Sequence, residues 1–218
     1  MSEIILMADP RVAAVPVREC GEPLIDVRSS LLVDPRKHRD SDTFHHLRAG
    51  VLERLVKAQA HLPGGLRFLV VEGYRPPDLQ RRYFDEYAAR LRAEHPGWPD
   101  ERLRSAASRW VSPPEIAPHS AGAAVDLTLA DADGRELDLG TPMNATPEDS
   151  DGACYTDAAG IGEQARTHRR ILGRALVTEG FVNYPTEWWH WSFGDRYWAL
   201  TTGAAGARYG TRSHGAAG

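Results

Sequence analysis

Cysteine is scarce in this chain, because Cys20 and Cys154 are the only two among 218 residues. Two thiols cannot build a disulfide framework, and neither cysteine belongs to a C-x-x-C pair, which argues against a zinc knot held by cysteines. A single disulfide between them is the alternative to two free thiols. We expect the free thiols that are usual in a reducing compartment.

Long apolar runs and basic runs are also missing. No stretch reaches the roughly 18 apolar residues of a membrane-spanning helix, and the N-terminal segment lacks the basic start and apolar run of a secretory signal. The formal net charge is -4, and the lysines and arginines form no stripe, so the sequence shows no footprint for nucleic acid. We therefore expect a cytoplasmic protein that binds neither a membrane nor nucleic acid.

What the chain does contain is a mixture of helical and strand-like patterns. Apolar residues recur at helical spacing in four segments, 45–62, 77–95, 100–110 and 163–179. Strand-like segments are 24–27, 66–71, 123–130, 181–184 and 188–193, with 135–139 expected to pair back as a hairpin. The stretch 140–162 is loop-like. The pattern predicts a single α+β domain with a mainly antiparallel central sheet flanked by helices.

The first candidate site segment is His119-Ser-Ala-Gly-Ala-Ala-Val-Asp126. Gly122 permits a turn between the histidine and the strand that follows. Asp126 then projects from an otherwise apolar strand, where a charged side chain needs a partner, and a metal ion is one. Taken alone, the segment also fits an aspartate at a sheet edge beside an ordinary loop histidine.

The second segment is Glu187-Trp-Trp-His190, within the aromatic run EWWHWSF. A half-buried, neutral His190 suits metal ligation, and Glu187, which follows Pro185 and Thr186, can face an open cavity. The alternative is an aromatic core with a hydrogen-bonded histidine. The spacing differs from the helical H-E-x-x-H motif, in which two histidines on one helix face bind zinc.

Arg75 stands where a buried strand ends, in the corner Glu72-Gly-Tyr-Arg-Pro76. An arginine at that place can stabilise a developing oxyanion, or it can hold a structural carboxylate. If the two distant segments meet in space, their imidazoles and carboxylates provide a zinc site with an open position and a general base beside it. This combination predicts a hydrolase.

The motifs E-G-Y-R-P, H-S-x-G-x-A-x-D and E-W-W-H, in this order, resemble those of the VanX-type D-alanyl-D-alanine dipeptidases, a family of zinc metallopeptidases. The resemblance extends from about Ile25 to Phe193. It implies one zinc ion per chain, held in a cleft over the sheet by three ligands. The implied ligands and catalytic residues are His119, Asp126 and His190 for zinc, Glu187 as general base and acid, and Arg75 as the cation that stabilises the transition state.

Two positions depart from the family pattern. Ala117 stands where the family has a serine that helps to hold the substrate carboxylate, and Asn144 stands where it has an aspartate that faces the substrate ammonium. Asn144 can accept a hydrogen bond but carries no charge, and Asp149 or Asp151 is an alternative source of that charge. The residues that we expect around the substrate are Ala117, Ser120, Asn144, Trp188 and Tyr74.

The expected activity is zinc-dependent hydrolysis of D-Ala-D-Ala or a closely related small dipeptide, a peptidoglycan precursor removed for glycopeptide resistance or D-alanine recycling. Two alternatives stay open: a peptidoglycan peptidase of the same family with another small-peptide substrate, and a non-catalytic zinc-binding relative. The catalytic domain is expected over residues 1–202, followed by a flexible Gly/Ala-rich tail over 203–218. The sequence does not indicate an oligomeric state.

Overall fold

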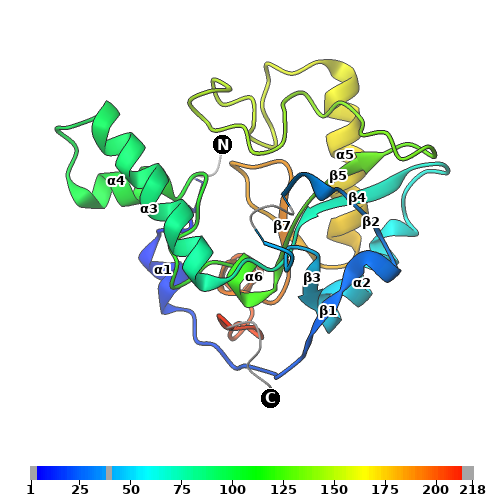
Figure 1. The fold of residues 1–218 in the computed structure, drawn as a ribbon, viewed down its shortest axis with the longest axis horizontal. Helices are drawn as coiled ribbons and strands as arrows, with labels where there is room; N and C mark the ends of the chain where they lie inside the picture. Colours follow the sequence, from blue (N-terminus) through cyan, green and yellow to red (C-terminus); the bar gives the residue numbers. More distant parts are fainter. Residues whose placement is uncertain (1–3, 38–40, 213–218) are drawn as a thin grey trace.

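The computed structural model describes residues 4–37 and 41–212 (Figure 1). The helices are α1 (Pro10–Ala14), α2 (Ala49–Gln59), α3 (Pro77–Glu94), α4 (Asp100–Ala107), α5 (Glu163–Thr178) and α6 (Arg196–Thr202), with the short 3-10 helices η1 (Val27–Ser29), η2 (Pro35–Lys37) and η3 (His119–Ala121). The strands are β1 (Leu24–Asp26), β2 (Leu32–Val33), β3 (His46–Arg48), β4 (Arg67–Glu72), β5 (Ala124–Ala130), β6 (Val182–Asn183) and β7 (His190–Ser192).

The central sheet has the strand order β2-β4-β5-β7-β6. Only β2 and β4 pair in parallel, and the other neighbours in this sheet are antiparallel. A separate two-stranded sheet joins β1 to β3. The predicted α+β class with a mainly antiparallel sheet is therefore confirmed.

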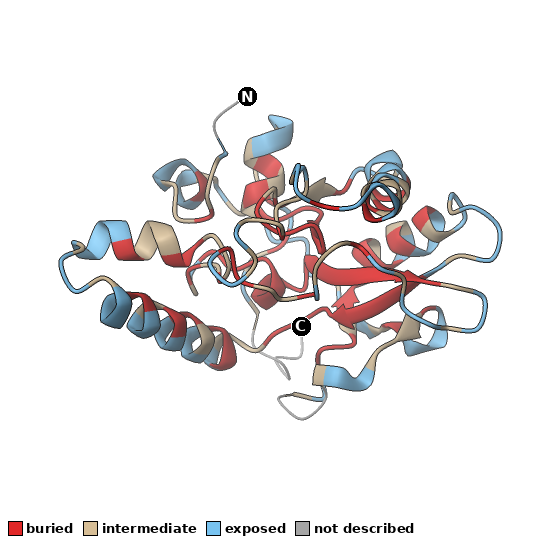
Figure 2. Cartoon of the chain, turned by 90° about the horizontal axis from the view of Figure 1, so that it is seen from above, coloured by how far each residue is buried: buried red, intermediate tan, exposed pale blue. Residues whose placement is uncertain are grey.

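Strand β5 lies in the middle of the sheet and is buried along its whole length. Because successive side chains of a strand point to opposite faces, Val125, Leu127 and Leu129 all enter the main core, to which α2 and α5 contribute Leu55 and Leu172. The intervening side chains of β5 face the other way, and Asp126 among them lines a cavity. Figure 2 shows the strands buried between helices whose outer faces are exposed.

Helices α3 and α4 form a hairpin that stands apart from the sheet (Figure 1). Apolar residues along one side of each helix pack into a second, smaller core: Phe84, Tyr87, Leu91, Leu103, Ala107 and Val111. Residues of α3 line one cavity together with residues of β5 and β7, so that α3 forms a wall opposite the sheet.

The predicted helix over 45–62 is too long at its start. Residues His46–Arg48 form β3 instead, and α2 begins at Ala49. The reason is tertiary: the β3 backbone pairs with β1, and Arg48 N donates to Gly122 O at 2.9 Å. Tertiary hydrogen bonds of this kind override a helical apolar pattern.

The expected hairpin over 135–139 is reduced to one bridge, between Ala130 and Glu136, with Leu137 N donating to Leu129 O at 2.8 Å. The expectation of a flexible tail from Gly203 is wrong for the part of the tail that the structure describes. Tyr209 is buried, and Arg212 N donates to Ser120 O at 2.9 Å. Residues 213–218 lie outside the described residues.

No helix in the described ranges, 4–37 and 41–212, combines the length and the apolar character needed to cross a membrane.

Candidate metal centre and active site

His119 is presented to the cleft by a tight turn. Gly122 adopts a left-handed conformation with φ of 66°, and a side chain there would overlap the side chain of Leu24. The turn directs the imidazole so that Nδ1 donates to Gly73 O at 2.7 Å. A histidine that donates from Nδ1 can ligate a metal ion through Nε2, and His119 Nε2 points toward His190 and Asp126.

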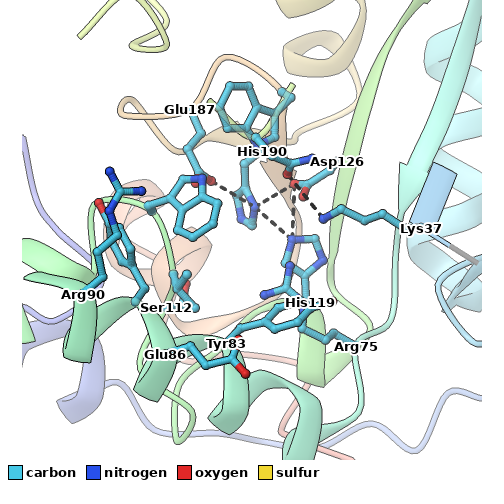
Figure 3. A pocket seen from close by; sticks show the side chains of 15 residues that line it. Lys37, Arg75, Tyr83, Glu86, Arg90, Ser112, His119, Asp126, Glu187 and His190 are labelled. Atoms are coloured by element: carbon cyan, nitrogen blue, oxygen red, sulfur yellow. Dashed lines mark hydrogen bonds and ion pairs between the residues drawn. The ribbon is translucent and has the colours of Figure 1, made fainter. Parts of the chain in front are cut away.

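Asp126 and His190 are brought together by the register of the sheet. They are direct cross-strand partners on β5 and β7, so both side chains point to the same face. Figure 3 shows them converging with His119 on one point. The three ligand atoms form a nearly equilateral triangle: His119 Nε2 to His190 Nδ1 is 3.1 Å, His190 Nδ1 to Asp126 Oδ1 is 3.1 Å, and His119 Nε2 to Asp126 Oδ1 is 3.3 Å.

The size and chemistry of this triangle fit zinc. With metal–ligand bonds of about 2.0–2.1 Å, tetrahedral coordination separates two ligand atoms by about 3.3 Å. All three residues are buried. Burial lowers the pKa of His190 and favours its neutral form. Burial acts to raise the pKa of Asp126, but the adjacent His119 and His190 hold it well below its ordinary value. The donor set is therefore two imidazoles and one carboxylate, with the fourth position open toward the cavity.

A second group of potential ligands, Asp26, His45 and His46, also comes together. The Asp26 carboxylate is occupied by Arg28, which donates to it from its backbone N and from its guanidinium. That engagement makes this group a weaker metal candidate than the buried triangle.

Glu187 lies beside the ligand triangle on the turn that precedes β7. Its Oε2 is 3.7 Å from His190 Nδ1, and its backbone N donates to Tyr184 O at 2.9 Å. Burial, and then the negative charge of Asp126, raise the pKa of Glu187 well above its ordinary value. The charge of a bound cation acts in the opposite direction. The carboxylate is thus placed next to the open position as a proton acceptor.

Arg75 is held rigidly at the opposite side of the centre. Its guanidinium pairs with Glu72 and donates from Nη1 to Gln80 Oε1 at 2.9 Å. Its backbone is fixed as well, because Ser120 Oγ donates to Arg75 O at 2.9 Å. The ring of Tyr83 lies under the guanidinium, 5.0 Å from its central carbon. These contacts fix a cation at the edge of the cavity.

The comparisons with known proteins identify the family of this chain. A peptidase family described as D-Ala-D-Ala dipeptidase matches residues 46–203. The chain belongs to the D-alanyl-D-alanine dipeptidase family. Membership in this family of hydrolases confirms the resemblance drawn from the three sequence motifs, and it makes the chain an enzyme of the peptidase class.

Relatives of known name include a D-alanyl-D-alanine dipeptidase from Synechocystis sp., 29% identical over 216 residues, which span 85% of this chain and 87% of the relative. Another, from Enterococcus faecalis, is 30% identical over 145 residues, 65% of this chain and 69% of the relative. Among solved structures, a mutant of the vancomycin-resistance D,D-pentapeptidase VanY in complex with Zn(II) aligns over 72% of this chain and 77% of its own, with 20% identity and a TM-score of 0.41.

Of the five residues that the sequence analysis expects around the substrate, one lines the cavity. Asn144 lines the cavity, but Tyr74, Ser120, Trp188 and Ala117 do not. Each of these four is buried. The Tyr74 hydroxyl donates to Arg212 O at 2.6 Å, Ser120 holds the Arg75 backbone, and Trp188 Nε1 donates to Thr141 Oγ1 at 2.9 Å.

Neither Asp149 nor Asp151 supplies the negative charge that the family aspartate has at the position of Asn144. Asp149 forms an ion pair with Arg90 at 3.0 Å and accepts from Thr146 Oγ1 at 2.7 Å. Neither Asp149 nor Asp151 is among the described residues that line the cavity.

The cavity is about 430 Å³ in volume, within the range of roughly 300–1,000 Å³ that holds ligands of drug size. Several wall residues were missed by sequence reasoning because most of them come from α3, from the segment after α4 and from η2, outside the motifs. These additional lining residues include Lys37, Tyr83, Glu86, Arg90, Trp110, Ser112 and Trp189. Only the aromatic run around Trp189 gives a signal in the sequence, and there the sequence predicts the neighbouring Trp188 as the cavity residue.

Proposed function

We propose that this chain is a zinc-dependent peptidase that hydrolyses D-Ala-D-Ala or a closely related small peptide. The observation that carries the proposal is the buried triangle of His119, Asp126 and His190 with Glu187 beside its open side. Membership in the dipeptidase family supports the peptide substrate. We further propose one zinc ion per chain, because the triangle supplies one set of three ligands.

Glu187 and Arg75 have different roles in the proposed hydrolysis of the peptide bond. When bound, zinc supplies a Lewis acid that polarises the scissile carbonyl and lowers the pKa of the attacking water. Glu187 accepts the proton of that water and then delivers it to the nitrogen of the leaving amine. Arg75, fixed by Glu72 and Gln80, stabilises the negative charge that develops on the carbonyl oxygen.

The decisive experiment measures metal content and turnover on the same preparations. We expect wild-type protein to bind one zinc ion and to release D-alanine from D-Ala-D-Ala. The Glu187→Ala variant should keep zinc and lose turnover, because Glu187 holds no ligand position in the triangle. His190→Ala is the matched comparison and should lose both. Wild-type turnover rates in the Glu187→Ala variant would refute the assignment of the general base.

The same experiment distinguishes the two alternatives. A zinc-loaded wild type that is inactive on D-Ala-D-Ala but active on other small peptides would identify a related peptidase with a different substrate. A zinc-loaded protein without any peptidase activity would indicate a binding protein. The position of Glu187 argues for catalysis, because burying a carboxylate that holds no ligand position is costly and a binding site has no use for it.

A further inference from the structure

One wall of the cavity carries a positive charge that the family motifs do not account for. The side chain of Lys37, from η2, is 16% exposed. Its ammonium contacts the buried Glu72 carboxylate and lies 3.3 Å from Asn144 Oδ1. Glu72 is already paired with Arg75. Two cations therefore share one carboxylate, and Asn144 is neutral, so that Lys37, Glu72 and Arg75 together carry a net positive charge.

This wall is adjacent to the metal centre. Glu72, Asp126 and His190 are consecutive cross-strand partners on β4, β5 and β7, so Lys37 reaches the cavity one strand away from a metal ligand. An ammonium has three donors. Among the described residues, Glu72 and Asn144 are the hydrogen-bond partners of Lys37 Nζ, which leaves one donor for a substrate oxygen.

The wall formed by α3 is more exposed to solvent than the Lys37 wall. Figure 3 shows Lys37 on one side of the His119–His190 pair, with Tyr83, Glu86 and Arg90 on the side of α3. The side chain of Glu86 is 67% exposed, and that of Arg90 is 42% exposed. The cavity is therefore closed and cationic at the Lys37 wall, and open at the α3 wall.

We propose that Lys37 binds the C-terminal carboxylate of the substrate and thereby sets which end of the peptide the enzyme recognises. The inference rests on the proposed peptidase function. In partly buried surroundings a carboxylate beside Lys37 is attracted and an ammonium is repelled. The amino end of the peptide then points toward the open α3 wall, where Glu86 can face a free ammonium and where a longer N-terminal part finds room.

The test compares three substrates on zinc-loaded protein: D-Ala-D-Ala, its C-terminal amide and its N-acetyl derivative. We expect the wild type to prefer the acid over the amide by about 10- to 100-fold in kcat/KM, the range for a hydrogen bond to a charged group. The N-acetyl derivative should remain a substrate within about 10-fold, because its changed end lies at the open wall.

Variants at Lys37 separate recognition from a structural role. Lys37→Met should remove most of the preference for the acid over the amide, and Lys37→Arg should restore part of it. Arg36→Met removes the same charge one residue earlier, where the side chain pairs with Asp34 and does not line the cavity. That control should keep the wild-type preference. An unchanged acid-to-amide ratio in Lys37→Met would overturn the proposal, as would a wild type that accepts the amide and rejects the N-acetyl derivative.

A binding measurement keeps this inference apart from the proposed reaction. Calorimetric titration of zinc-loaded Glu187→Gln protein with the acid and the amide, with and without Lys37→Met, reports recognition without turnover. If the protein binds the acid more tightly than the amide but the wild type shows no turnover, the proposed reaction is refuted and Lys37 remains the site that binds the carboxylate. Turnover with equal affinity for acid and amide would keep the reaction and refute this role of Lys37.

Discussion

Replacing Glu72 by glutamine tests the charge network beside the metal centre. The Glu72 side chain is fully buried, and its two oxygens are divided between Lys37 and Arg75. Glutamine keeps the shape of the side chain but removes the negative charge, so the two cations are left without a carboxylate between them. Removing one partner from a buried ion pair typically costs roughly 3–5 kcal/mol.

The pKa of Glu72 gives a second measure of the same interaction and fixes its pH dependence. Burial acts to raise this pKa, but Arg75 and Lys37 lower it from 4.5 to about 2. At about 1.4 kcal/mol per pH unit, the difference between 4.5 and about 2 corresponds to about 3 kcal/mol. Because the pKa of the folded state is depressed, this stability is fully present above pH 4.5 and is lost as the pH falls toward 2.

We therefore expect urea unfolding of metal-stripped Glu72→Gln protein to show a free energy of unfolding about 3 kcal/mol below that of the wild type at pH 7. The two proteins should converge between pH 4.5 and pH 2. Glu53→Gln removes an exposed charge from α2 and serves as the matched control, which should follow the wild type at every pH. A loss in Glu72→Gln that does not vary with pH would show that the carboxylate is not held ionised by its two partners.

Three further predictions concern the site and its supports. Arg75→Met should lower kcat by about 100- to 1,000-fold while the zinc content measured by mass spectrometry stays unchanged; lost zinc would contradict its assignment to the oxyanion. Gly122→Ala should weaken zinc binding in a chelator competition, because the new methyl group overlaps Leu24. Gly180→Ala, also at positive φ but without overlap, should leave zinc affinity unchanged, and equal losses in both variants would contradict this reasoning. His119→Ala should reduce the zinc content to near zero, and a retained ion would place the metal elsewhere.

The fold and the residues of the candidate metal centre were predictable from the sequence where local patterns determine them. The strand β4 and the helices α3 and α5 follow from apolar periodicity and from Pro77 and Gly180 at their ends. His119 and Asp126 follow from a turn glycine and an apolar strand that are close in sequence. In each case the determining residues lie within one element or its immediate neighbours, so that a short window of sequence contains the information.

The walls of the cavity were not predictable in the same way. Lys37 lies in an irregular stretch without periodicity, and its contact with Glu72 depends on the parallel pairing of β2 with β4. Trp188 and Trp189 precede β7, which begins at His190, so strand alternation does not determine which of the two rings reaches the cavity. Both choices depend on long-range packing, which a single sequence does not reveal.

A bulge in β4 shows why the site and the fold depend on the same residues. Val70 pairs with Leu127, and regular antiparallel pairing would then place Val71 opposite Asp126. The register shifts between Val70 and Glu72, so that Glu72 takes that position instead. Bulges re-aim side chains near active sites. Here the extra residue keeps both valines in the main core and turns the Glu72 carboxylate to the cleft face. Without the shift, Glu72 would point into the apolar core, where a carboxylate without a partner is strongly unfavourable, and neither Arg75 nor Lys37 would be held at the cavity.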